Sequence, residues 1–343
     1  MTRLRIPLAI LAVSGVVALL VGFNTSRQTN QATASQQAAL IAPSSAGQLQ
    51  NDFVNVYRRV APSVVQIETT EGLGSGIVFD GQGHIVTNAH VVGTAKSFTV
   101  TTSKGRQLKA TLVGTFTADD LAVIKVPGSS GLKPAVFANS SKLRVGDIAM
   151  AIGNPLGLSS SVTQGIVSAL GRSSSEGGGV TLPNTIQTSA PINPGNSGGA
   201  LADIQGRVIG VPTLAAADPQ MGGAAAGIGF AIPSNTVKDI AGQIVENGKV
   251  VNSHRAYLGI SIGDTGEGVY VGSVSAGAPA GKAGIKVGDV IVAVDGQQTL
   301  NSDALGSVLA QHRPGQTVKV KIARQNGSSA TVNVTLGEYP GGS

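Results

Sequence analysis

The chain has 343 residues, of which 41% are hydrophobic, and it contains no cysteine. This length fits two domains with tails, and the missing cysteines exclude a disulfide framework, a thiol nucleophile and a zinc ribbon. The net charge is +6, but the lysines and arginines are scattered and do not alternate with aromatic residues, so we expect no nucleic-acid partner.

The first 23 residues predict a membrane segment. Residues 1–5 carry Arg3 and Arg5, and the uncharged apolar run Ile6–Phe23 follows. This run approaches the length that spans a bilayer, and basic residues on its N-terminal side stay in the cytoplasm. We therefore expect a single-pass signal anchor in the cell membrane, with the remaining chain on the periplasmic or extracellular side. A cleaved signal peptide, with Ala32-Thr33-Ala34 as the cleavage motif, is the alternative.

A linker and a β-rich domain follow. Residues 24–50 are mostly polar or small, which predicts a flexible linker. Residues 51–248 form the first predicted domain, which begins with a short helix around Phe53–Val60. Short apolar runs separated by glycine turns then predict the strands of a β-barrel or sandwich. These runs are Val64–Ile67, Gly76–Phe79, His84–Thr87, Leu121–Val126, Ile148–Ile152, Val162–Leu170, Arg207–Val211 and Gly227–Ile232.

A helix and a second, smaller domain complete the chain. The apolar spacing predicts a helix over Ser234–Asn247, with Ser234 as its N-cap and Gly248 after its end. The second domain covers residues 255–339 and has an α+β pattern, with one helix after Ser302. Its predicted strands are Leu258–Ile262, Val269–Val274, Val290–Val294, Val318–Ala323 and Ala330–Leu336.

Ser197 is the candidate nucleophile of an acyl-transfer site. It lies in the run Pro194–Gly199, among small residues that leave room for a substrate backbone. Gly195, Asn196 and Ser197 form the candidate oxyanion hole, in which the N–H groups of Gly195 and Ser197 would be the donors. The same letters also fit an ordinary flexible turn.

A base and a carboxylate would have to accompany this serine. Of the four histidines, His90 lies at the end of a predicted strand, where functional residues are common. Asp119 and Asp120 stand together before another strand, and either could orient the histidine ring. His90, an aspartate and Ser197 follow one another in the order found in chymotrypsin-type enzymes.

Three blocks of the sequence resemble the HtrA/Deg family of trypsin-like serine proteases. They are Thr87–Val92, Asp120–Val126 and Ile192–Leu201. The resemblance implies a mainly β protease domain of two six-stranded barrels, with His90 as general base, Asp120 as its orienting group and Ser197 as nucleophile. It also implies that Ile192 floors an aliphatic specificity pocket and that Gly229, Phe230 and Ala231 form the strand that pairs with substrate.

The second domain resembles a PDZ domain. The run Arg255–Ile260 is similar to a carboxylate-binding loop, so Tyr257, Leu258, Gly259 and Ile260 are the candidate residues for binding peptide C-termini. In one respect the sequence departs from the family: Ser189-Ala190-Pro191 stands where the family has Asp-Ala-Ala. An acidic residue near the pocket is therefore missing.

The resemblance implies an ATP-independent serine endopeptidase that needs no cofactor or metal. It would cleave unfolded or damaged envelope proteins through an acyl-enzyme, as part of quality control under stress. The PDZ domain would regulate this activity, and a segment around Asp52–Arg59 would form a homotrimer. The alternative function is that of a catalytically silent peptide-binding scaffold or chaperone.

Overall fold

The structure is a computed structural model, and it describes residues 45–70, 72–128, 131–154, 161–175, 181–193, 195–218 and 223–341. The chain divides into two compact units, Met1–Val54 and Asn55–Ser343. The described residues of the first unit, 45–54, belong to helix α2 (Ser45–Val60). The helix thus begins inside the segment predicted as a linker. No helix within the described ranges is long and apolar enough to cross a membrane, and Ile6–Phe23 lies outside those ranges.

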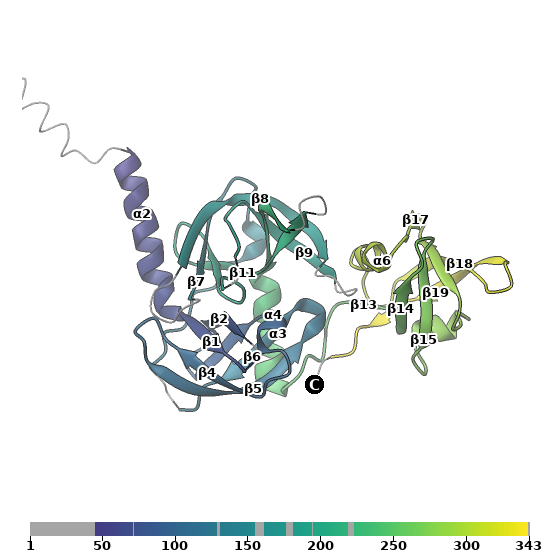
Figure 1. Ribbon diagram of the computed structural model, residues 1–343, viewed down its shortest axis with the longest axis horizontal. Helices are drawn as coiled ribbons and strands as arrows, with labels where there is room; N and C mark the ends of the chain where they lie inside the picture. The colour runs from purple at the N-terminus through teal and green to yellow at the C-terminus, as the bar shows by residue number, and fades with distance from the viewer. Residues whose placement is uncertain are drawn as a thin grey trace, which may run out of the picture. The chain divides into compact units, whose positions relative to one another are not determined.

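Six strands of the second unit close into a first barrel, in the order β1-β2-β3-β6-β5-β4. Valine and isoleucine dominate its interior, because β-branched side chains pack well on a pleated surface. Figure 1 labels β1, β2, β4, β5 and β6 of this barrel. The elements are η1 (Ala61–Ser63), β1 (Val64–Glu68), β2 (Leu73–Val78), β3 (His84–Thr87), α3 (Ala89–Val92), β4 (Ser97–Thr101), β5 (Gln107–Phe116), η2 (Thr117–Asp119) and β6 (Leu121–Lys125).

A second barrel has the strand order β10-β11-β12-β9-β8-β7. Its core contains Val167, Ile186, Leu201 and Ile209. Two closed six-stranded barrels confirm the predicted fold class, and closure leaves no long unpaired strand edge in either barrel. The elements are η3 (Ser140–Lys142), β7 (Ile148–Gly153), β8 (Ser161–Ser175), β9 (Thr181–Thr188), β10 (Ala200–Ala202), β11 (Val208–Asp218) and β12 (Gly223–Pro233).

Helix α4 (Ser234–Asn247) has the predicted bounds, but its predicted N-cap is wrong. The fully buried Ser234 hydroxyl donates to the carbonyl oxygen of Ala138 at 3.0 Å and does not cap the helix. Gly248 ends the helix as expected: its φ is +71°, and its N–H donates to the carbonyl of Ile244. The helix packs against β5 and β6 of the first barrel and against β11 and β12 of the second.

The C-terminal part contains a separate sheet with its own core. Alternating burial along β18 places Val318, Val320 and Ile322 in that core. The strand order is β14-β15-β16-β18-β19, β17 pairs with β16, and β13 pairs with β20. The elements are β13 (Ala256–Tyr257), β14 (Ile260–Asp264), β15 (Val269–Val274), α5 (Pro279–Lys282), β16 (Val290–Val294), β17 (Gln297–Gln298), α6 (Ser302–Leu309), β18 (Thr317–Ala323), β19 (Ser329–Thr335) and β20 (Gly337–Glu338).

Candidate active site

Strand register brings His90 and Asp120 together. Antiparallel strands β3 and β6 pair with Thr87 opposite Ala122. The residues just after β3 and just before β6 therefore meet at one end of this pair. Two hydrogen bonds fix the junction, because the Ala89 N–H and the side-chain amide of Asn88 both donate to the carbonyl of Asp120.

The Asp120 carboxylate holds the His90 ring directly. His90 Nδ1 lies 2.8 Å from Asp120 Oδ2, and the backbone N–H of His90 donates to Oδ1 at 3.0 Å. The Thr213 hydroxyl also donates to Oδ2, at 2.7 Å. The Asp120 side chain is 3% exposed and the His90 side chain is 41% exposed. A buried carboxylate thus orients a histidine whose ring remains accessible to solvent, as a general base requires.

The loop that carries Ser197 packs tightly against the first barrel. Ser75, fully buried on β2, donates its hydroxyl to the Gly195 carbonyl at 2.5 Å and its N–H to the Ser197 carbonyl at 3.0 Å. Gly198 has φ +77°, and an added Cβ would lie 2.2 Å from the Ser75 carbonyl oxygen. A residue with a side chain would therefore force the loop apart from β2.

In this structure the Ser197 hydroxyl donates to the carbonyl oxygen of Thr213 at 2.7 Å. A hydroxyl has one proton to donate. That proton is therefore directed at the Thr213 carbonyl, and donation to His90 requires rotation about the Cα–Cβ bond of Ser197.

The candidate oxyanion donors are two of the three residues predicted. The Asn196 N–H donates to the Asn193 carbonyl at 2.9 Å and is used within the turn. This leaves the N–H groups of Gly195 and Ser197 as the donors. Gly195 has φ +105°, which other residues rarely adopt.

Two of the predicted substrate-binding residues lie in contact. Ile192 is 7% exposed, and its Cγ1 would lie 2.4 Å from a Cβ added at Gly229. The predicted substrate strand is wrong, however. Residues 229–231 lie in the middle of β12, with β9 paired on one side and β11 on the other. Gly229 and Ala231 have partners on both edges, and Phe230 pairs with β9 while β11 bulges opposite it, so these residues offer no free edge to which a peptide could add as a strand.

Ser189, which replaces the usual acidic residue, ties the end of β9 to β8. Its hydroxyl accepts the Ile166 N–H at 3.0 Å, and its own N–H donates to the Ile166 carbonyl at 3.1 Å. The neutral hydroxyl therefore makes one hydrogen bond at this position, and the backbone N–H makes the second.

Asp119 lies beside the catalytic candidates but points to a different partner. Its side chain is 6% exposed, and Oδ1 lies 2.6 Å from Nη1 of Arg255. Burial raises the pKa of the Asp119 carboxyl, and the Arg255 guanidinium opposes that shift. The preference for Asp120 over Asp119 as the partner of His90 agrees with this geometry.

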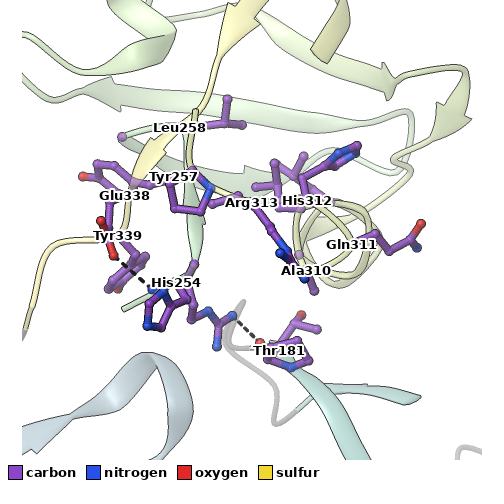
Figure 2. A pocket seen from close by; sticks show the side chains of 18 of the residues that line it. Thr181, His254, Tyr257, Leu258, Ala310, Gln311, His312, Arg313, Glu338 and Tyr339 are labelled. Carbon is purple, nitrogen blue, oxygen red and sulfur yellow. Dashed lines mark hydrogen bonds between the residues drawn. The ribbon is translucent and has the colours of Figure 1, made fainter. Parts of the chain in front are cut away.

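The four predicted peptide-binding residues of the C-terminal domain line one cavity of about 1100 Å³, which Thr181, Pro183 and Asn184 of β9 also line. Figure 2 shows Tyr257 and Leu258 on its strand side and Ala310 to Arg313 at the end of the helix. Gly259 turns the chain between β13 and β14 with φ +77°. Leu305 and Leu309 of α6 add apolar surface. Such a groove between a strand and a helix suits an extended peptide.

Sequence reasoning missed Thr213 and Ser75. Neither shows a periodic or compositional signal that separates it from other hydroxyl residues of β strands. Their positions become apparent only when the two barrels are in place, because each binds a residue distant in the chain. Among the described residues, no cluster of three or more histidines and carboxylates could hold a metal.

Comparisons with known proteins agree with this arrangement. Residues 74–211 match the family described as trypsin-like peptidase domain, and residues 256–336 match the PDZ domain family. Serine protease PepD of Mycobacterium tuberculosis is 40% identical over an alignment of 353 positions, which covers 95% of this chain and 75% of that protein. The chain belongs to the HtrA/Deg family of serine proteases.

Other members of the family match almost as much of the chain. Serine endoprotease DegS of Escherichia coli is 35% identical over 308 residues, which cover 82% of this chain and 85% of DegS. The solved structure of the HtrA-type protease AlgW with a tripeptide is 35% identical, with a TM-score of 0.57. That match covers 84% of this chain and 97% of the AlgW chain. The protein is thus a serine protease with one PDZ domain.

Proposed function

We propose that the protein is an ATP-independent serine endopeptidase in which His90, Asp120 and Ser197 carry the reaction. The observation that carries this proposal is the 2.8 Å contact between His90 Nδ1 and a buried Asp120 oxygen that Thr213 also binds. With Nδ1 bound to a carboxylate, the second ring nitrogen can take a proton, and the carboxylate stabilises the resulting cation.

The proposed reaction begins with rotation of the Ser197 hydroxyl from the Thr213 carbonyl toward His90. His90 takes the hydroxyl proton as Oγ attacks the substrate carbonyl, and the N–H groups of Gly195 and Ser197 stabilise the oxyanion. His90 then gives the proton to the departing amine, which leaves an acyl-enzyme. Water, activated by the same histidine, hydrolyses this ester and restores Ser197.

We expect the pocket beside Ile192 to accept small or medium aliphatic side chains. Ile192 belongs to an apolar cluster, which favours aliphatic over charged side chains next to it. Chains that are unfolded or damaged expose such residues in extended segments, so unfolded envelope proteins are the proposed substrates.

The PDZ domain is proposed to bind peptide C-termini and to regulate the protease. Support comes from the cavity along Tyr257–Ile260, where backbone N–H groups beside Gly259 could hold a carboxylate. A peptide that ends in an aliphatic residue should raise activity, and deletion from Ala256 onward, which keeps Arg255, should abolish the response. A response that survives the deletion would contradict this regulation.

The remaining proposals concern location and assembly. An anchor at Ile6–Phe23 would place the protease outside the cytoplasm, and the segment Asp52–Arg59 on α2 would contribute to a homotrimer. Analytical ultracentrifugation of the full chain in detergent tests the trimer. A monomeric sedimentation coefficient would rule it out.

Casein degradation by the full chain and by Ser197→Ala tests the endopeptidase directly. We expect the substitution to lower the rate of degradation at least 10³-fold, because the nucleophile of a triad is lost. Equal degradation by both proteins would disprove the role of Ser197, and no degradation by either protein would favour the scaffold.

A further inference from the structure

Arg255 links the first residues of the PDZ domain to the turn that presents the catalytic carboxylate. Its Nη1 donates to Asp119 Oδ1 at 2.6 Å and to the carbonyl of Ala118, and its Nη2 donates to the carbonyl of Thr181 at 2.5 Å. Figure 2 draws the bond to Thr181 as a dashed line. Arg255 therefore joins η2 of the first barrel to β9 of the second.

Asp120 directly follows η2 and has an unusual backbone conformation. Its φ is +48° and its ψ is +43°, in the left-handed region, which disfavours residues with a side chain. Such a conformation persists only where surrounding contacts enforce it. Ala118 and Asp119, the two residues before it, are the ones that Arg255 binds.

The position of Arg255 is itself well fixed. The Tyr339 N–H donates to the Arg255 carbonyl at 2.8 Å, and β13 pairs with β20 directly after Arg255. The Tyr339 ring packs edge-to-face against two other rings, with ring centroids 5.4 Å apart for Tyr257 and 6.0 Å apart for Phe116. Phe116 is the last residue before η2, so contacts hold this turn from two directions.

The electrostatics make the Asp119–Arg255 pair sensitive to loss of one member. Asp119 is buried, and a buried carboxylate without its cation is costly. The other groups whose charge acts on Asp119 are Asp239 and His254. The distance between Asp239 Oδ2 and His254 Nε2 is 3.4 Å. These two side chains are 46% and 70% exposed, so solvent screens them more than it screens Arg255.

We propose that Arg255 is a positioning residue for the protease reaction, which acts by holding η2 so that Asp120 keeps its left-handed conformation and its bond to His90. The proposal rests on the proposed roles of Asp120 and His90. Arg255 lines the cavity of the C-terminal domain, and its hydrogen bonds go to Ala118, Asp119 and Thr181, so its loss should act on the protease reaction by misplacing Asp120.

The experiment compares Arg255→Gln with the double variant Arg255→Gln/Asp119→Asn in the full chain. We expect Arg255→Gln to lower kcat on a fluorogenic peptide by about 10–100-fold, with KM within two-fold, because small misplacements of a catalytic group have effects of this size. The double variant should stay about as slow as Arg255→Gln, because it still lacks the guanidinium that binds the Ala118 carbonyl and the residue 119 side chain.

Arg324→Gln is the matched control. Arg324 pairs with Asp289 at 2.8 Å, and the Asp289 side chain is 4% exposed, so this second buried pair resembles the first but lies within the PDZ fold. We expect Arg324→Gln to keep kcat within two-fold at a temperature where circular dichroism shows each variant folded. An equal loss of kcat in Arg255→Gln and Arg324→Gln would overturn the proposal.

Two further outcomes would also overturn it: an unchanged kcat in folded Arg255→Gln, or a kcat close to that of the wild type in the double variant, which would trace the loss to the unpaired carboxylate alone. Labelling with a fluorophosphonate separates these failures from a failure of the proposed function. If the wild type is labelled at Ser197 and Arg255→Gln reacts at the same rate, the positioning role alone is wrong. If the wild type is not labelled at Ser197, the proposed triad itself is wrong.

Discussion

Replacing Thr213 by valine should slow the protease by about 10–150-fold. The Thr213 hydroxyl donates to Asp120 Oδ2 at 2.7 Å, and Thr213 is fully buried, so water cannot replace the lost donor. A hydrogen bond to a charged group contributes about 1.5–3 kcal/mol. If this stabilisation serves the imidazolium–carboxylate pair that forms in the transition state, its loss converts to the stated factor.

The assay for this prediction is kcat/KM on a fluorogenic peptide, with Thr213→Ser as the control. Serine keeps the hydroxyl, and both variants keep the Thr213 carbonyl that accepts the Ser197 hydroxyl. We expect Thr213→Ser to stay within about three-fold of the wild type. If Thr213→Val and Thr213→Ser have equal kcat/KM, the hydroxyl does not support Asp120 and the reasoning is refuted.

Three further predictions follow from the packing of the site. Gly229→Ala should raise KM for aliphatic substrates by displacing Ile192, since the new Cβ would lie 2.4 Å from Ile192 Cγ1; an unchanged KM would contradict this pocket. Gly198→Ala should lower both the melting temperature and the fluorophosphonate reaction rate, because its Cβ would lie 2.2 Å from the Ser75 carbonyl oxygen; a variant as stable and as reactive as the wild type would exclude this close contact. Burial raises the pKa of the Asp119 carboxyl above its ordinary value of 3.8 in the folded state. As the pH rises from 3.8, the carboxyl therefore loses its proton in the unfolded chain before it does so in the folded chain, and the free energy of unfolding falls. The free energy of unfolding of Asp119→Asn, measured by urea titration, should therefore improve relative to the wild type as the pH rises toward neutrality; a constant difference would argue against it.

Much of the fold was predictable because its strands are short, apolar and bounded by glycine turns. Strands β15 and β16 and helix α4 have the predicted bounds. The N-cap of α4 was not predictable in this way, because a cap needs the serine oxygen to accept a backbone N–H, whereas the Ser234 hydroxyl donates to the Ala138 carbonyl, which is distant in the chain.

The site was predictable where its residues lie in long motifs and not where they act across barrels. The sequence around His90, Asp120 and Ser197 indicates the triad, and the structure places His90 against Asp120. The pairing of Gly229 and Ala231 on both edges depends on how β11 and β9 flank β12, which no local pattern reveals. The contact between Arg255 and Asp119 joins residues 136 positions apart and equally needs the fold.

The central claim is that Ser197 is a nucleophile activated by His90 and Asp120. The most direct measurement is labelling of the full chain with a fluorophosphonate, followed by mass spectrometry of the modified peptide. We predict a single adduct on Ser197, and labelling slowed by about 10⁴-fold in Asp120→Asn, the size of effect expected when the histidine loses its orienting carboxylate. An adduct on another serine, or an unchanged labelling rate in Asp120→Asn, would contradict the claim.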